Sequence, residues 1–294
     1  MRVFQNVRGL WREEIQWCNR GLSAARALNR RKDEGTLLHN VAWCYDALGE
    51  RRRALEYYEQ ALPIRREVGD RAGEATTLNN IGIVYDNLGE RRRALETYEQ
   101  ALPIMREVGD RAGEATMLNN IGLVYDALGE RRRALDYYEQ ALPIRREVGD
   151  RAGEATTFNN IGMVYDALGE RRRALEYLEQ ALPIRREVGD RAGEATTLNN
   201  IGTVYDNLGE RRRALEYFEQ ALPIRREVGD RAGESVTQYN MAMVQQAEGN
   251  HAEAGRLLEQ VVAIDEAIEH PDLESDRAAL EEARRQAGLS SARS

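Results

Sequence analysis

The chain has few of the residues on which secreted, membrane-spanning and metal-dependent proteins rely. Its two cysteines, Cys18 and Cys44, both lie within the first 44 residues, which argues against a disulfide framework. Its three histidines, His39, His251 and His270, are not in metal-ligand spacing with the cysteines. No apolar run approaches the roughly 18 to 20 residues that span a bilayer, and the N-terminus lacks a signal-peptide core. We therefore expect a cytoplasmic protein that is not embedded in a membrane.

The features of an active site are also missing from the sequence. A catalytic centre needs unlike groups that converge on one point, whereas most of this chain copies one segment along its length. There is no G-x-x-x-x-G-K-[ST] stretch for nucleotide phosphates. A net charge of −8, with 31% charged residues, is unlike that of a nucleic-acid binder. We expect no catalysis, no cofactor and no metal site, and consider a nucleic-acid partner improbable.

Repetition is what the chain has in abundance. The segment Gly69–Leu88 is followed by a second segment to Val108, and together they define a period of 40 residues. Residues 71–110 and 191–230 are identical at 36 of 40 positions. A unit of this size cannot bury its apolar face without stacking on its neighbours, so the period predicts a solenoid. The segment returns at Gly109, Gly149 and Gly189, and more loosely at Gly229.

Each period predicts an antiparallel pair of helices. Leu78, Ile81 and Tyr85 recur at helical spacing, Gly89 ends that first helix, and a second apolar stripe follows from Ala94. Proline occurs well inside the second helix, where it removes one amide donor and predicts a bend rather than an end. The same bend in every repeat would rotate the stack by a constant amount. The predicted fold is therefore an all-α solenoid of helix hairpins wound into a right-handed superhelix.

The residues at these positions resemble the tetratricopeptide repeat signature, lengthened to 40 residues. Leu78, Ile81, Gly82, Tyr85 and Ala101 carry the resemblance. The stretch LNNIG with the downstream ALPIMRE is similar to repeats of the kinesin light chain type, and LWREEIQW near the N-terminus resembles the start of such arrays in bacterial signal-transduction NTPases. The resemblance covers about residues 1 to 270. It implies an interaction scaffold whose first helices line a concave groove.

The period also predicts the boundaries of the repeats. Gly9 aligns with Gly49, so residues 1–8 would be the tail of a first helix, leaving Val3, Phe4 and Val7 uncovered. Either the segment was cut from a longer protein, which we favour, or this face packs on another chain. The expected units are 1–30, a truncated first repeat comprising the end of a first helix plus a second helix; the full repeats 31–70, 71–110, 111–150, 151–190 and 191–230; a degenerate last repeat, 231–270; and a capping helix with its tail, 271–294.

Steps of about 100° per residue place three rows of side chains opposite the core stripe of the first helices. The amides of the asparagine row can pair with an extended peptide backbone, and the carboxylates of the aspartate row can attract a basic ligand. The third, mostly apolar row could select the side chains of a ligand. Asparagines of this kind contact peptides in kinesin light chain-like repeats, which the resemblance implies here too. The candidate groove residues are Asn79, Asn119, Asn159 and Asn199; Asn40, Asn80, Asn120, Asn160, Asn200 and Asn240; Asp86, Asp126, Asp166 and Asp206; and Trp43, Ile83, Leu123, Met163, Thr203 and Met243.

Each row has a plain structural alternative. One asparagine row, that of Asn80 in particular, could bond to a neighbouring helix and hold the stack, and the aspartates could form a solvated face. The Ile83 position changes in every copy while its flanking residues hardly change. Such a strip suits a peptide or helix with apolar side chains, although neutral drift at an exposed site would give the same pattern.

Two functions and one assembly follow as hypotheses. The leading function is a protein-interaction scaffold that holds a peptide or helix of a partner in the groove. The alternative is a C-terminal ligand-sensing or autoinhibitory repeat module of a larger bacterial signalling ATPase. Self-association through the uncovered N-terminal face is a further possibility.

Overall fold

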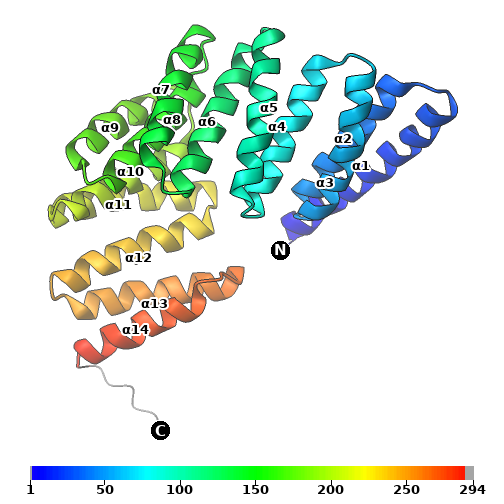
Figure 1. Cartoon of the computed structure of the whole chain (residues 1–294). Helices are drawn as coiled ribbons and strands as arrows, with labels where there is room; N and C mark the ends of the chain where they lie inside the picture. Colours follow the sequence, from blue (N-terminus) through cyan, green and yellow to red (C-terminus); the bar gives the residue numbers. More distant parts are fainter. Residues whose placement is uncertain (1, 289–294) are drawn as a thin grey trace. The chain divides into compact units, whose positions relative to one another are not determined.

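The computed structural model describes residues 2–288, with side chains from residue 9 onward. All regular elements in this part of the chain are α-helices, and short turns join them into antiparallel pairs (Figure 1). The helices are α1 (Arg2–Ala27), α2 (Arg31–Ala47), α3 (Arg51–Glu67), α4 (Arg71–Asn87), α5 (Arg91–Glu107), α6 (Arg111–Ala127), α7 (Arg131–Glu147), α8 (Arg151–Ala167), α9 (Arg171–Glu187), α10 (Arg191–Asn207), α11 (Arg211–Val228), α12 (Arg231–Ala247), α13 (His251–Ile268) and α14 (Leu273–Gln286).

The chain divides into two compact units, Met1–Asp150 and Arg151–Ser294. The first contains α1 and the hairpins α2/α3, α4/α5 and α6/α7. The second contains the hairpins α8/α9, α10/α11 and α12/α13, followed by α14. In each unit the first helices of successive hairpins lie against one another, as do the two helices of each hairpin. The predicted all-α solenoid of antiparallel hairpins is therefore confirmed.

Glycine and aspartate set the helix boundaries. Gly109 follows α5 with φ +72°, a left-handed conformation that costs glycine little. Asp110 then caps α6, because its carboxylate accepts a hydrogen bond from the Gly113 N–H at 2.8 Å. Pro103 lies inside α5, which continues through it to Glu107. As predicted, the helix continues past the proline. A bend at this residue stays a prediction.

Small residues let the two helices of a hairpin approach closely. A Cβ atom on Gly82 of α4 would lie 2.4 Å from the Tyr98 ring of α5, so only glycine fits at this contact. Ala94 and Ala101 of α5 are fully buried beside it. Tyr98 is itself almost fully buried, so the glycine makes room for a large apolar side chain in the core.

The N-terminal helix differs from the sequence-based expectation. Helix α1 runs without interruption through Gly9, so no first helix ends there. Glycine permits a left-handed turn but does not impose one, and Leu10 stands where the hairpins from α2/α3 to α10/α11 have a glutamate after the glycine. The side chains of Val3, Phe4 and Val7 lie outside the described residues. Self-association through this face stays a prediction.

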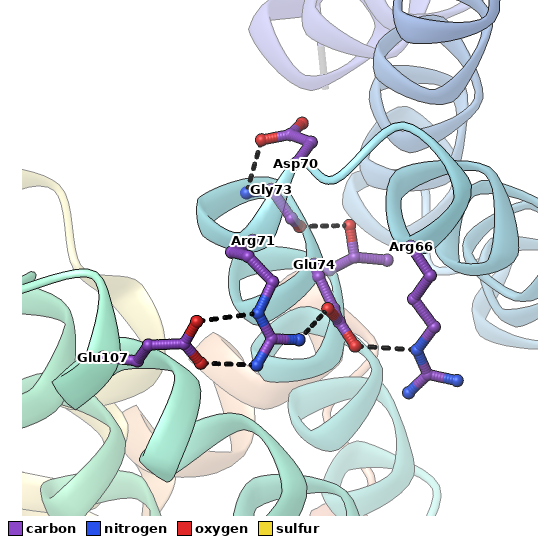
Figure 2. Close-up of polar contacts among 7 residues, drawn as sticks. Arg66, Asp70, Arg71, Gly73, Glu74 and Glu107 are labelled. Carbon is purple, nitrogen blue, oxygen red and sulfur yellow. Dashed lines mark hydrogen bonds and ion pairs between the residues drawn. The ribbon is translucent and has the colours of Figure 1, made fainter.

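Glu74, a buried glutamate near the start of α4, joins three helices (Figure 2). Arg66 at the end of α3 donates to Glu74 Oε1 at 2.7 Å, and Arg71 of α4 donates to Oε2 at 2.5 Å. Arg71 also forms a two-point contact with Glu107 at the end of α5, at 2.6 and 3.3 Å. Glu74 is 3% exposed, so its charge is balanced by arginines rather than by water. We call Arg66, Arg71, Glu74 and Glu107 the junction network.

The junction network recurs within both units. Hydrogen bonds from Arg26 and Arg31 lower the pKa of the Glu34 carboxyl below its usual range. Within a unit, the pairing joins a hairpin to the helix before it. In α2, α4, α6, α8 and α10 it also joins the start of the first helix to the end of its second helix. Equivalent contacts link Glu34 with Arg26 and Arg31; Glu114 with Arg106 and Arg111; Glu194 with Arg186 and Arg191; and Glu234 with Arg226 and Arg231.

Replacement of Glu74 by glutamine tests the junction network. The Glu74→Gln amide keeps the size of the side chain but turns one acceptor into a donor that faces an arginine. We expect the free energy of unfolding to fall by about 2 kcal/mol in urea denaturation. The control is Glu96→Gln on the exposed face of α5, for which we expect less than about 0.5 kcal/mol. Equal effects of the two changes would show that the network adds no stability.

Candidate functional site

The exposed face of the first helices follows the helical period. In α4, Leu78 and Ile81 are buried. Thr76 is exposed, and Asn79 and Ile83 are partly exposed. In the first unit this face belongs to α2, α4 and α6, and in the second to α8, α10 and α12. It is the candidate binding face, and the rows of predicted site residues run across it.

The two asparagine rows bond to one another between neighbouring first helices. In the first unit, Asn120 Nδ2 of α6 donates to Asn79 Oδ1 of α4 at 3.3 Å. In the second unit, Asn200 donates to Asn159 at 3.0 Å. The next step of that unit repeats the contact, from Asn240 to Asn199 at 3.2 Å. These contacts form an amide ladder, in which each Asn79-type oxygen accepts from the Asn80-type amide of the next hairpin.

The ladder also uses threonines that the sequence analysis did not single out. The Thr237 hydroxyl lies 3.2 Å from Asn199 Oδ1 and 2.9 Å from the Gly233 carbonyl. Thr237 is fully buried, and Asn199 is 7% exposed. The amides therefore have a clear role in stacking, the alternative that the sequence left open. Thr77, Thr157 and Thr197 occupy the equivalent buried position, and their 40-residue spacing was visible in the sequence.

His39 begins the ladder in the first unit, at the position that Asn79 occupies one repeat later. Its Nε2 atom lies 3.3 Å from Asn80 Nδ2, and its Nδ1 atom lies 3.0 Å from the Thr77 hydroxyl. Thr77 donates to the Gly73 carbonyl, so the network fits a neutral ring that donates from Nδ1 and accepts at Nε2. Burial, with a smaller contribution from Arg65, lowers the pKa of His39 to about 4.

The aspartate row lies at the C-terminal end of the first helices. Asp86 Oδ1 is 3.9 Å from Arg91 Nε, at the start of the second helix of the same hairpin. Asp126 and Asp166 lie similarly near Arg131 and Arg171. Partial burial raises the pKa of the Asp86 carboxyl, against the effect of Arg91. Each of these carboxylates thus has a cationic neighbour, while part of its surface stays open on the face.

The variable row, which is the Ile83 position of each first helix, is also open on the face. Trp43 is 48% exposed and Leu123 is 42% exposed. Ile83, at the same position in the hairpin between them, is partly exposed. Trp43 also packs edge-to-face on Trp11 of α1, with ring centroids 4.7 Å apart. In the second unit, Met163, Thr203 and Met243 are partly exposed at the same position.

These hairpins define a helical-repeat protein, and comparison with known families identifies the repeat. The sequence model described as tetratricopeptide repeat matches residues 7–67, 54–107, 73–147, 113–187, 153–227 and 193–267. The chain belongs to the tetratricopeptide repeat family, as its sequence predicts. Repeats of this family typically form protein-interaction scaffolds.

Solved structures with the same fold include proteins of several kinds. BtubC (BKLC) from P. vanneervenii is 27% identical, with 74% of this chain and 92% of that one covered and a TM-score of 0.66. The nearly identical repeats of a putative kinesin light chain from Podosopora anserina are 22% identical, with 66% and 95% covered and a TM-score of 0.55. The STAND protein PH0952 from Pyrococcus horikoshii, which has a tetratricopeptide repeat sensor, is 17% identical, with 97% and 44% covered and a TM-score of 0.74.

Two further comparisons are negative. No curated protein matches the chain. Among residues 2–288, no helix combines the length and apolar character that crossing a membrane requires.

Replacement of His39 by asparagine tests the buried histidine. Because the folded-state pKa lies near 4 and the unfolded value near 6.5, protonation favours the unfolded chain as pH falls between them. We expect the wild type to lose about 1 to 2 kcal/mol more than His39→Asn between pH 7 and pH 5, in urea denaturation. The introduced amide would accept from Asn80 and Thr77 as Asn199 does from Asn240 and Thr237. Parallel pH profiles of the two proteins would contradict the assignment.

Replacement of Asn199 by alanine tests the amide ladder. The change leaves the amide of Asn240 without its acceptor and removes one of two acceptors of the buried Thr237 hydroxyl. We expect Asn199→Ala to cost about 1 to 3 kcal/mol in the free energy of unfolding. Asn87→Ala is the control, because Asn87 is exposed and α6 carries alanine at the same position. A melting curve of Asn199→Ala that matches the control would return these amides to a ligand-binding role alone.

Proposed function

We propose that the chain is a protein-interaction scaffold whose first-helix face binds a peptide or helix of a partner. The variable row carries the proposal, because it is the position that changes from each copy to the next and is open on the face. Near-identity elsewhere makes this change informative: α4 and α10 differ only at Ile83 and Thr203. A row of different apolar side chains would select a partner by the shape of its own side chains.

The face of α2, α4 and α6 suits a ligand that is apolar along one edge and basic along the other. Trp43, Ile83 and Leu123 provide the apolar row, and Asp46, Asp86 and Asp126 run beside it near the helix ends. The asparagines lie between the apolar row and the helix N-termini, where they hold neighbouring helices in register. In this proposal their remaining hydrogen-bonding capacity assists partner binding, and selection falls to the other two rows.

The same reasoning applies to the second unit by itself. Met163, Thr203 and Met243 form its variable row, and Val236 adds an apolar side chain that is 47% exposed. We infer that each unit selects its own part of a partner. We also infer a binding rather than a catalytic role, in a cytoplasmic setting and with a protein rather than a nucleic acid as partner.

Replacement of two apolar side chains on the face tests the proposal. The variant is Ile83→Thr with Leu123→Thr, and the fold should be kept because Thr203 occupies this position in α10. Peptides selected from a display library on the wild-type protein should bind the variant at least about tenfold more weakly in fluorescence titration, because apolar contact is lost.

The control is Val108→Thr, which changes an exposed apolar side chain at the end of α5. We expect it to alter the dissociation constant less than about twofold. Failure to select any peptide, or equal binding to both variants, would overturn the proposed face.

A second candidate function is a ligand-sensing or autoinhibitory module of a larger signalling ATPase. The specific observation is the TM-score of 0.74 with the STAND protein, of which this chain covers 44%. That likeness supports a shared fold, and the sensor role is an inference from it. An in-frame nucleotide-binding domain in the coding sequence upstream of Met1 would favour this candidate, and a stop codon directly before a ribosome-binding site would remove it.

A further inference from the structure

The last hairpin and the helix that follows it bring together three potential metal ligands. Asp265 lies in the last turn of α13, His270 in the connection, and Asp276 in the first turn of α14. One ligand atom from each side chain lies within 4.8 Å of the others. Asp265 is 1% exposed and Asp276 is 6% exposed, while His270 is partly exposed. The cluster therefore combines two buried carboxylates with an imidazole that solvent can reach.

Four of the five internal hairpins place an arginine at this point, and α4/α5 has Met105 instead. In the preceding hairpin, the buried Arg225 donates to the helix-capping Asp230 at 2.5 Å. Asp265 and His270 follow these residues by one period of 40. The last hairpin thus has a carboxylate where its predecessor has a guanidinium. The positive charge that balances the niche elsewhere is missing from these side chains, and a second carboxylate, Asp276, has been added.

The Asp265 carboxylate is incompletely satisfied. Asp265 Oδ1 is buried and has no hydrogen-bond partner among the described residues. It lines a cavity of about 340 Å³ together with His270, Asp276 and Ser275. A buried acceptor that faces a cavity beside a second carboxylate and an imidazole is a favourable environment for a cation.

We propose that Asp265, His270 and Asp276 bind a divalent transition-metal ion, with Zn²⁺ the best match, and that this ion stabilises the packing of α14 on α13. Two carboxylate oxygens and one imidazole nitrogen are common zinc ligands, and three protein ligands leave a position for water. The imidazole favours zinc over Mg²⁺ and Ca²⁺, which prefer oxygen ligands alone. The ligands come from both helices, so the ion would link them directly.

This proposal departs from the sequence-based expectation of no metal site. That expectation compared the histidines with the cysteines and did not consider the carboxylates near His270. The available signal was the break in the repeat, where Arg225 and Asp230 give way to Asp265 and His270.

Hydrogen exchange of the full chain with ZnCl₂ tests the proposal. The protein is first treated with EDTA and kept reduced at pH 7.5, so that the two cysteines stay thiols. At free zinc about ten times the dissociation constant, amide exchange in residues 264–286 should slow about tenfold. Residues 111–147, in the other unit, serve as the internal reference and should not change. MgCl₂ at the same concentration should have little effect.

Matched variants separate zinc binding at this cluster from binding elsewhere. Asp265→Arg with His270→Asp rebuilds the Arg225–Asp230 pair of the preceding hairpin, so it should fold and lose the zinc response. Glu248→Gln removes an exposed carboxylate that lies outside the cluster and should keep the response. The proposal is overturned by no slowing in the wild type or by equal slowing in the double variant. An equal response to magnesium would overturn the choice of a transition metal.

Discussion

The burial of one glutamate per hairpin is the constraint on which the rest of the structure depends. A carboxylate such as Glu74 can stay charged in the interior only if cationic groups reach it, and Arg66 and Arg71 come from two different helices. Arg71 is held in turn by Glu107 at the end of the following helix. The spacing between helices that lets the arginines reach the buried glutamate of one hairpin also lets them reach that of the next hairpin in the same unit. An array built in this way tolerates little change at its arginines and glutamates, and the copies show little.

The amide ladder adds a second demand on the first helices. Asn120 can reach Asn79 only when α6 lies beside α4 in the correct register, so the ladder and the junction network require the same arrangement of hairpins. Together they use the polar positions at the start and middle of each first helix. The Ile83 position lies outside both networks and can change without disturbing either. This is why variation there is a better guide to partner binding than the more uniform asparagines.

Much of the fold was predictable because helical hairpins depend on local signals repeated at a fixed interval. The stripe from Leu78 to Tyr85 and the glycines after each helix are sufficient to indicate the hairpins. Gly9 is not a helix end, although its place in the period predicts one. Glycine allows a helix to end without requiring it, and α1 continues through this residue. The candidate face was also predictable from the period. The partners of its side chains were not, since Asn79 and Asn120 are 41 residues apart and either water or a neighbour could satisfy an exposed amide.

The junction network was harder to predict for a related reason. Arg71 and Glu107 are 36 residues apart, and both look like ordinary surface charges when each helix is considered alone. Their pairing requires knowledge of which helix ends meet. The same limit explains the C-terminal hairpin, where Asp265 and Asp276 lie on successive helices and only the fold brings them together. In a repetitive chain, a residue that departs from the period at a buried position is therefore more informative than one that follows it. A buried carboxylate such as that of Asp265 needs a positive charge nearby, and the arginine of the preceding hairpin is no longer present to provide it.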